Sequence, residues 1–114
     1  MDNHPYTYVF VRTDISFEQQ LVQSAHAALE SGFAFNAPHE TSSIVMIAAK
    51  NRNELFKIAN HLESNEIQFK MFFEPDFDMG ESAIATEAIC CPKKRNALKK
   101  YQLYKFKDVN YDID

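Results

Sequence analysis

Two short segments of the chain are apolar on both faces. Residues 6–11 read Tyr-Thr-Tyr-Val-Phe-Val and residues 43–49 read Ser-Ile-Val-Met-Ile-Ala-Ala. Continuous apolar runs of this length are typical of strands that are covered on both sides. Two further segments, residues 67–73 and 82–89, carry apolar residues separated by polar ones. The hydrophobic pattern therefore predicts four strands.

Two helices are predicted between the first three strands. Ser16 followed by Gln19 is a capping-box pattern, in which the Ser hydroxyl accepts from a backbone amide and the Gln side chain reaches back. The helix that starts there is expected to cover residues 17–31 and to end near Gly32. Asn51 followed by Glu54 marks a second helix start, and Asn65 is a plausible stop.

The first of these helices is expected to be amphipathic. At 100° per residue, its predicted buried stripe consists of Phe17, Leu21, Ala25, Ala28 and Leu29. A neighbouring side carries Gln19, Gln23, His26 and Glu30. His26 lies on the border between the two sides, which is a partly buried position.

The order of elements is β-α-β-α-β-β, and it predicts an α/β fold. Helical crossovers favour parallel neighbouring strands, whereas the short link at residues 74–81 favours antiparallel ones. We therefore expect a mixed sheet of at least four strands with helices on its faces, in a single α/β domain covering residues 1–114. A short helix at Pro92 and an edge strand from Tyr101 to Phe106 would complete it.

Composition narrows the class of protein. The 114 residues are 46% hydrophobic and include ten Phe and five Tyr, which is enough for a packed core. No apolar run approaches the roughly 20 residues of a membrane span. The adjacent cysteines at 90 and 91 cannot form a disulfide framework. These features indicate a soluble cytoplasmic protein with reduced thiols.

The net charge of −4 conceals a strong asymmetry. Residues 1–92 carry five basic and thirteen acidic side chains, whereas residues 93–107 carry seven basic side chains and no acidic one. We call the first five of those seven the basic block: Lys93, Lys94, Arg95, Lys99 and Lys100. Such a block could contact nucleic-acid phosphates. It could equally be a solvated helix followed by an edge strand, where Lys discourages edge pairing.

Polar and titratable residues gather where the first strand meets the first helix. His26 could act as a general base, or it could simply bond a neighbour at the helix border. Asp14 could orient a substrate or a water, or it could bond the amides of the helix entry. Arg12 could pair with Asp14 or with the acidic 74–81 loop.

The 74–81 loop carries four carboxylates. Glu74, Asp76, Asp78 and Glu81 offer oxygen ligands that a hard cation would accept, but their spacing does not fit a calcium loop of the EF-hand type. A polar connection is the better interpretation, so no metal and no other cofactor is expected. Ser82 could face a site on its side of the fourth strand.

The first strand and helix resemble the archaeal and eukaryotic, or second, class of peptidyl-tRNA hydrolases. The matching residues are Val11, Arg12, Asp14, Ile15, Gln23, His26 and Ala27, and Met79-Gly80-Glu81-Ser82-Ala83-Ile84 looks like a later stretch of that family. Gln19 stands where the family has its active-site lysine, and Glu74-Pro75-Asp76 lies in the region of a family run that contains an aspartate. The chain would be a divergent bacterial-type or phage-type relative.

This resemblance implies a function and a site. It implies hydrolysis of an RNA-linked ester such as peptidyl-tRNA, with catalytic roles for His26, Asp14 and Asp76. Substrate contacts would come from Arg12, Gln19, Gln23, Glu74 and Ser82, and the basic block would hold tRNA or another RNA. A homodimer is a further expectation from the family. The alternative is a non-catalytic binding or regulatory module on the same fold, with RNA, a small ligand or a protein as partner.

Overall fold

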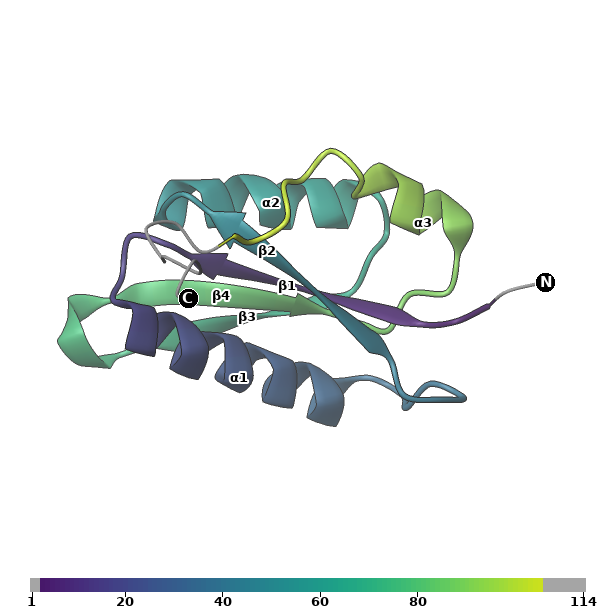
Figure 1. The fold of residues 1–114 in the computed structure, drawn as a ribbon, viewed down its shortest axis with the longest axis horizontal. Helices are drawn as coiled ribbons and strands as arrows, with labels where there is room; N and C mark the ends of the chain where they lie inside the picture. The colour runs from purple at the N-terminus through teal and green to yellow at the C-terminus, as the bar shows by residue number, and fades with distance from the viewer. Residues whose placement is uncertain (1–2, 106–114) are drawn as a thin grey trace, which may run out of the picture.

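The computed structural model describes residues 3–105, which form a twisted sheet with helices on both faces (Figure 1). In chain order the elements are β1 (Tyr6–Arg12), α1 (Phe17–Ala34), β2 (Ser43–Ala49), α2 (Arg52–Ser64), β3 (Phe69–Glu74), a 3-10 turn η1 (Asp76–Asp78), β4 (Gly80–Thr86) and α3 (Pro92–Ala97). The predicted α/β architecture with four strands is confirmed.

The sheet is mixed, with strand order β2-β1-β4-β3. β1 pairs in parallel with β2, because the α1 crossover returns the chain in the same direction. β4 runs antiparallel to both β1 and β3, and the short η1 connection reverses the chain between β3 and β4. As expected for a segment that is apolar on both faces, β1 is an interior strand.

Side-chain caps begin both long helices at the predicted residues. The Ser16 hydroxyl accepts from the Gln19 amide at 3.2 Å, and Asn51 Oδ1 accepts from the Glu54 amide at 3.0 Å. The second half of the predicted capping box is different, because the Gln19 side-chain oxygen accepts from Gln23. α1 is also longer than predicted and includes Gly32.

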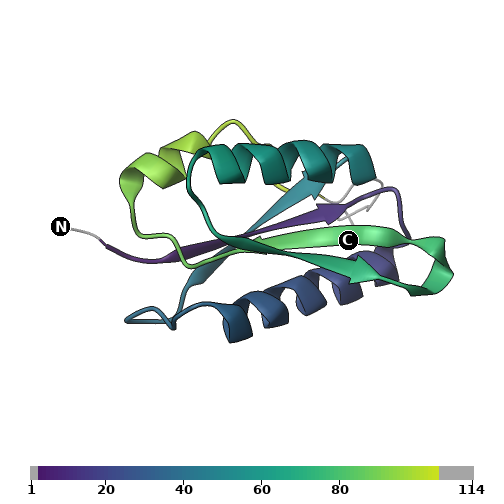
Figure 2. The ribbon, with the colours of Figure 1, turned by 180° about the vertical axis from the view of Figure 1, so that it is seen from behind.

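The larger core lies between the sheet and α2. Tyr8 and Phe10 of β1 point to this side, and α3 leads into Leu98, which closes one end. Its buried members are Tyr8, Phe10, Ile47, Ala49, Leu55, Ile58, Leu62, Ile67, Ile84, Ile89 and Leu98. The two views of the ribbon show α2 and α3 on this face and α1 alone on the other (Figures 1 and 2).

The core beneath α1 is smaller, and the predicted buried stripe of α1 is wrong. The buried residues of this helix are Gln23, Ala27 and Ser31. Ala27 packs in a cluster with Val9 and Val11 of β1 and with Ala83 and Ala85 of β4. Of the predicted stripe, Ala28 is partly buried, and the members that face solvent are Phe17, Leu21, Ala25 and Leu29. The helix is rotated so that small and polar residues meet the sheet.

The last predicted edge strand is reduced to a bridge. Leu103 pairs with Ile47 at a single position, and the Tyr104 amide donates to the Met46 carbonyl at 2.9 Å. Phe106, the predicted end of that strand, lies outside the described residues. β4 also begins at Gly80, two residues earlier than predicted, and ends at Thr86.

A histidine–tyrosine pair joins α2 to the segment after α3. His61 Nδ1 lies 2.7 Å from the Tyr101 hydroxyl, whose ring packs edge-on against Phe10. Burial, and then the positive charge of Lys100, hold the pKa of His61 below its usual value. Burial and the negative charge of Glu54 raise the pKa of Tyr101, which keeps the hydroxyl protonated. A neutral His61 can therefore accept a hydrogen bond from the Tyr101 hydroxyl.

This pair predicts a loss of stability in mild acid. Because the folded-state pKa of His61 is lowered, the unfolded chain binds more protons as pH falls below about 6.5. We expect the free energy of unfolding to decrease below that pH, and a His61→Gln variant to show a weaker decrease. His39→Gln, at an exposed position, is the control. Urea unfolding between pH 7.5 and 5 measures it, and parallel pH curves for wild type and His61→Gln would contradict it.

Candidate functional site

Gln23 lies at the centre of a polar cluster beneath α1. Its side chain is fully buried between α1 and the strands β3 and β4. Its Nε2 donates to Gln19 Oε1 at 3.0 Å and to Glu74 Oε1 at 2.9 Å. Its Oε1 accepts from the Ser82 hydroxyl at 2.7 Å. We call Gln19, Gln23, Glu74 and Ser82 the amide–carboxylate centre.

The centre joins three elements that are far apart in the sequence. α1 supplies the two glutamines, Glu74 is the last residue of β3, and Ser82 lies on β4. Both protons and the oxygen of the buried amide have partners, as a buried amide requires. The structure therefore brings four of the predicted substrate-binding residues into contact: Gln19, Gln23, Glu74 and Ser82.

Glu74 is the ionised group of this centre. The hydrogen bond from Gln23 lowers the pKa of the Glu74 carboxyl most, followed by the hydrogen bond from the Asp76 backbone amide; the electrostatic influence of His26 is smaller. The Asp76 amide donates to Glu74 Oε2 at 3.1 Å. A carboxylate with a lowered pKa is a weak base at neutral pH. It stays negatively charged, however, and it can accept further hydrogen bonds beside those from Gln23 and Asp76.

His26 lies beside the centre on an aromatic platform. Its ring stacks on Phe72 of β3, with 4.5 Å between ring centroids and 2° between planes. His26 is exposed, so the ring face that does not touch Phe72 can meet a ligand. The sequence did not identify Phe72 as a site residue, because an apolar residue in a predicted strand is expected to belong to the hydrophobic core.

Arg12 and Asp14 form a separate ion pair at the end of β1. Arg12 Nε donates to Asp14 Oδ1 at 2.8 Å and Nη2 donates to Oδ2 at 3.1 Å. Arg12 Nη1 also donates to the carbonyls of Met79 and Glu81. Arg12, a predicted substrate-binding residue, thus holds the β3–β4 connection in place, and the predicted catalytic Asp14 holds the Arg12 side chain. The ion pair lies next to the centre, because the Glu81 carbonyl that Arg12 binds immediately precedes Ser82 in β4.

The connection that Arg12 holds is strained. Phe77 and Asp78 adopt left-handed backbone conformations with φ of 60° and 52°, which cost energy for residues with a side chain. Gly80 follows with φ of 75°, where glycine is at ease. Arg52 adds an ion pair to Glu81 at 2.7 Å. Two arginines from different elements therefore fix this turn and, with it, the end of β3 that carries Glu74.

Two further predicted residues have more limited parts in the centre. Asp76 contributes its backbone amide to Glu74, and its side chain lies in the exposed turn. Gln19 accepts from Gln23, so it orients the buried amide at the position where the family resemblance expects a lysine. Nothing in the geometry gives Asp76 the catalytic role that the resemblance implies.

The basic block lies on the opposite face of the sheet from the centre. α3 lies on the same face of the sheet as α2, whereas Gln23 and His26 belong to α1 on the other face (Figure 2). Lys94 pairs with Glu87 at 3.4 Å. Arg95 lies over the Tyr6 ring and donates to the Tyr8 hydroxyl, which raises the pKa of Arg95. Part of the block is thus engaged in packing, and the block does not adjoin the centre.

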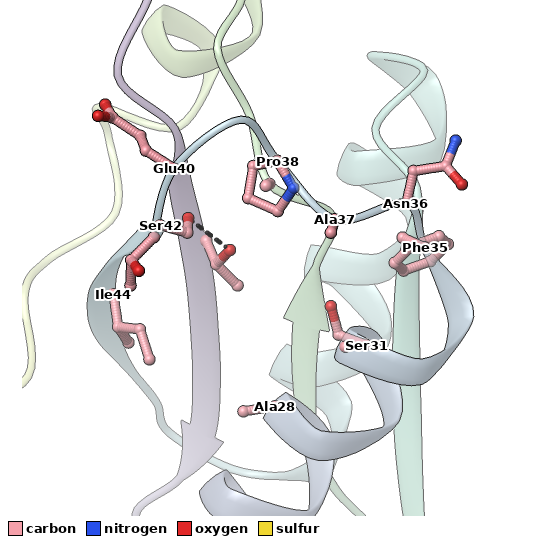
Figure 3. A pocket seen from close by; sticks show the side chains of 13 residues that line it. Ala28, Ser31, Phe35, Asn36, Ala37, Pro38, Glu40, Ser42 and Ile44 are labelled. Carbon is pink, nitrogen blue, oxygen red and sulfur yellow. Dashed lines mark hydrogen bonds between the residues drawn. The ribbon is translucent and has the colours of Figure 1, made fainter.

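A cavity of about 550 Å³ opens on the other side of α1, near the C-terminal end of the helix (Figure 3). Apolar lining residues include Ala28, Pro38 and Ile44, and the hydroxyls of Thr7 and Ser42 bond each other across it at 2.8 Å. Its single lining carboxylate, Glu40, is paired with His4. The cavity is large enough for a ligand, but its only titratable lining residue is the paired Glu40. The amide–carboxylate centre is therefore the better candidate site.

Comparison with known proteins identifies the fold alone. The chain matches no known protein family, and no curated protein is significantly similar in sequence. A solved structure of a protein of unknown function from Agrobacterium tumefaciens strain C58 is similar, with a TM-score of 0.63 and 15% identity over 92% of this chain and 100% of that one. At this identity the similarity supports the α/β fold and says nothing of activity.

Two kinds of feature are absent from the residues that the structure describes. Within residues 3–105 there is no group of three or more His, Cys, Asp or Glu side chains placed to hold a metal ion. The four acidic residues of the 74–81 segment therefore do not form a candidate cation site. No helix in this range is long and apolar enough to cross a membrane.

The buried amide predicts a measurable effect on both stability and titration. In a Gln23→Ala variant, Ser82 loses its amide partner and Glu74 loses the hydrogen bond that most lowers its pKa. We expect a loss of about 1–3 kcal/mol of unfolding free energy, as for a buried polar group left unpaired. We also expect a higher pKa for Glu74.

Urea unfolding and carboxyl NMR titration test this prediction. Gln102→Ala, at an exposed position, is the matched control and should behave as wild type. An unchanged Glu74 titration in Gln23→Ala would show that the hydrogen bond does not hold the carboxylate ionised.

Proposed function

We propose that the protein is a divergent relative of the second class of peptidyl-tRNA hydrolases that acts as a binding module. The amide–carboxylate centre would bind a small ligand through a cationic amino group, with Glu74 as the anion. The observation that carries this proposal is the ionised Glu74, held by a fully buried glutamine at an accessible edge of the sheet.

The surroundings of Glu74 favour a cation. Asp76 and Asp78 lie in the adjoining turn, and Glu18 lies on the first turn of α1. The nearby Arg12 is paired with Asp14, so it does not present a free positive charge. An ammonium group that approaches Glu74 would be attracted, whereas a phosphate would be repelled. His26 on Phe72 adds a flat surface beside the anion for the rest of the ligand.

The relationship to the hydrolase family is supported by two observations. The motif residues Arg12, Asp14 and Gln23 follow the family pattern, and Glu74 lies in the region where the resemblance expects an acid. The mixed α/β sheet agrees with the fold that the family implies. The family's lysine is replaced by Gln19, which carries no charge and whose oxygen already accepts from Gln23. This replacement favours binding over turnover.

Binding of a primary amine tests the proposal. We expect butylamine, added to ¹⁵N-labelled protein at pH 7, to shift backbone amide signals in residues 19–26 and 72–76. Butyrate of the same length should leave them unchanged, because Glu74 repels it. The Glu74→Gln variant should lose the amine response, and Asp78→Asn should keep it as the control for the charge of the turn. Equal responses to amine and butyrate would refute the proposal.

Hydrolysis is the second candidate function, and the position of His26 favours it. An exposed imidazole beside a fixed carboxylate is an arrangement that can act as a general base. The hydrolase substrate would be an ester such as peptidyl-tRNA, as the resemblance implies.

An assay of peptidyl-tRNA cleavage separates the two candidates. The binding module should release no tRNA above the buffer rate. If the protein is a hydrolase, His26→Ala should lose about 10²–10⁴-fold in rate, the usual contribution of a general base. His39→Ala, which changes an exposed histidine in the loop after α1, should retain the rate. A variant with the basic block neutralised, compared at several salt concentrations, reports whether that block contacts RNA phosphates.

A further inference from the structure

His4 joins a serine to a carboxylate near the start of β2. Its Nδ1 lies 2.6 Å from Glu40 Oε2, and its Nε2 lies 2.7 Å from the Ser43 hydroxyl. The two partners are 36 and 39 residues away in the sequence, so no local motif predicts the contact. A hydroxyl, an imidazole and a carboxylate in this order are the arrangement of a catalytic triad. We call His4, Glu40 and Ser43 the serine triad.

The chemistry of the two partners decides which nitrogen of the neutral His4 ring carries the proton. An ionised carboxylate only accepts hydrogen bonds, so Nδ1 donates to Glu40. Nε2 then carries the lone pair and accepts from the Ser43 hydroxyl. In this tautomer His4 can take the hydroxyl proton when Ser43 attacks a substrate, and Glu40 stabilises the imidazolium that forms.

The position of the His4 ring is fixed by its neighbours. Pro5, the next residue, is fully buried, and its carbonyl accepts from the Ser43 amide at 3.0 Å. This backbone bond aligns the two segments, so that the imidazole and the hydroxyl meet. The ring also packs edge-on against Tyr6, with 5.1 Å between ring centroids. Groups that are oriented before the substrate arrives contribute much of the rate of an enzyme.

The start of β2 also offers a donor for the negative charge that develops on an ester oxygen. β2 is an edge strand next to β1. Because the Ser43 amide points to β1, the next amide, that of Ile44, points to the outer side of β2. In hydrolases of the α/β type, the amide that follows the nucleophilic serine is one of the donors to the oxyanion. The Ile44 amide has the corresponding place in this chain.

The exposure of the serine triad limits the class of substrate. The side chain of His4 is 30% exposed and that of Glu40 49%, and Ser43 is exposed as well. The Glu40 carboxylate points away from the other labelled side chains of the cavity (Figure 3). The triad therefore opens to the surface and not into the cavity. A site this open suits a small ester with a short acyl group, and it admits the water that completes the reaction.

The serine triad is separate from the amide–carboxylate centre. Ser43 shares a face of β2 with Val45 and Ile47, which belong to the core beneath α2. Gln23 and His26 lie on the other face, with α1. An activity of the triad therefore depends neither on the ligand proposed for the centre nor on hydrolysis by His26.

We propose that the serine triad is an esterase site for small carboxylic esters, with Ser43 as nucleophile, His4 as general base and Glu40 as the residue that positions His4. The Ser43 oxygen bonds to the carbonyl carbon, and its proton passes to His4 Nε2. The C–O bond of the ester then breaks, and the alcohol leaves with that proton. Water attacks the acyl-serine and gives a proton to His4, which returns it to Ser43 as the carboxylic acid departs.

A fluorophosphonate tests the proposal, because an activated serine displaces its fluoride and keeps the phosphonyl group. We expect mass spectrometry to find one adduct on wild type, in the peptide that contains Ser43. Ser43→Ala should gain none. Ser42→Ala is the matched control and should label as wild type, since the Ser42 hydroxyl bonds Thr7. Circular dichroism checks that each variant is folded.

The rate of labelling tests the roles of His4 and Glu40. His4→Gln should label about 10²–10⁴-fold more slowly, the usual contribution of a general base. Glu40→Gln should also label more slowly, because an amide can donate to Nδ1 and favour the wrong tautomer. Glu40→Asp, which keeps a carboxylate, should recover part of the rate. His26→Gln, which removes an exposed imidazole on the other face, should label as wild type.

Hydrolysis of p-nitrophenyl acetate measures turnover at the same site. We expect wild type to release a burst of about one nitrophenolate per chain before the steady state, because an acyl-serine accumulates. Ser43→Ala should show no burst, whereas Ser42→Ala should keep it.

Three results would overturn the proposal. One is a wild type that gains no fluorophosphonate adduct. Another is an adduct on a residue other than Ser43. The third is a His4→Gln variant that labels at the rate of wild type. In each case His4 would serve only as a structural link between the segment before β1 and the start of β2.

Discussion

The buried amide of Gln23 sets the orientation of α1 and, through it, much of the molecule. A primary amide without partners is costly inside a protein, so Gln23 has to face Gln19, Glu74 and Ser82 together. Only one rotation of the helix about its axis brings it there. Ser31, two turns later on the same side, donates to the Thr86 carbonyl at 2.8 Å and fixes the other end. These two polar anchors outweigh the tendency of the leucines on α1 to turn inward.

The two faces of the sheet are built on different principles as a result. Beneath α2, large side chains such as Phe10, Leu55 and Leu62 fill the core, and stability comes from apolar area. Beneath α1, the smaller core consists of short side chains beside a polar centre: Val9, Val11, Ala27, Ala83 and Ala85. Small residues let the helix lie close to the sheet, and they leave little room for its own leucines. The polar centre and the exposed apolar side chains of α1, such as Leu21, Leu29 and Phe33, are therefore two consequences of one helix orientation.

The fixed position of the Glu74 carboxylate affects what the centre can do chemically. Glu74 is held by hydrogen bonds at the end of a strand whose following turn is fixed by Arg12 and Arg52. A carboxylate in so defined a position suits recognition, because its geometry does not have to be ordered when a ligand arrives. Catalysis of ester cleavage needs groups that stabilise negative charge in the transition state. Gln23 directs its protons to Gln19 and Glu74, and Arg12 is bound to Asp14, which leaves little of that kind at the centre.

Local pattern was sufficient for the order of elements, the caps at Ser16 and Asn51, and the interior place of β1, because these depend on neighbouring residues and on continuous apolar runs. The family resemblance added Gln23, His26, Glu74 and Ser82 as site candidates. Local pattern could not predict the rotation of α1 about its own axis. A helical wheel assumes that the most apolar side faces the core, whereas the actual orientation depends on partners at Glu74 and Ser82, which lie more than fifty residues away in the sequence. The stacking of His26 on Phe72, the pairing of Arg12 with the β3–β4 turn and the separation of the basic block from the centre were likewise decided by tertiary structure, because each depends on which elements share a face of the sheet.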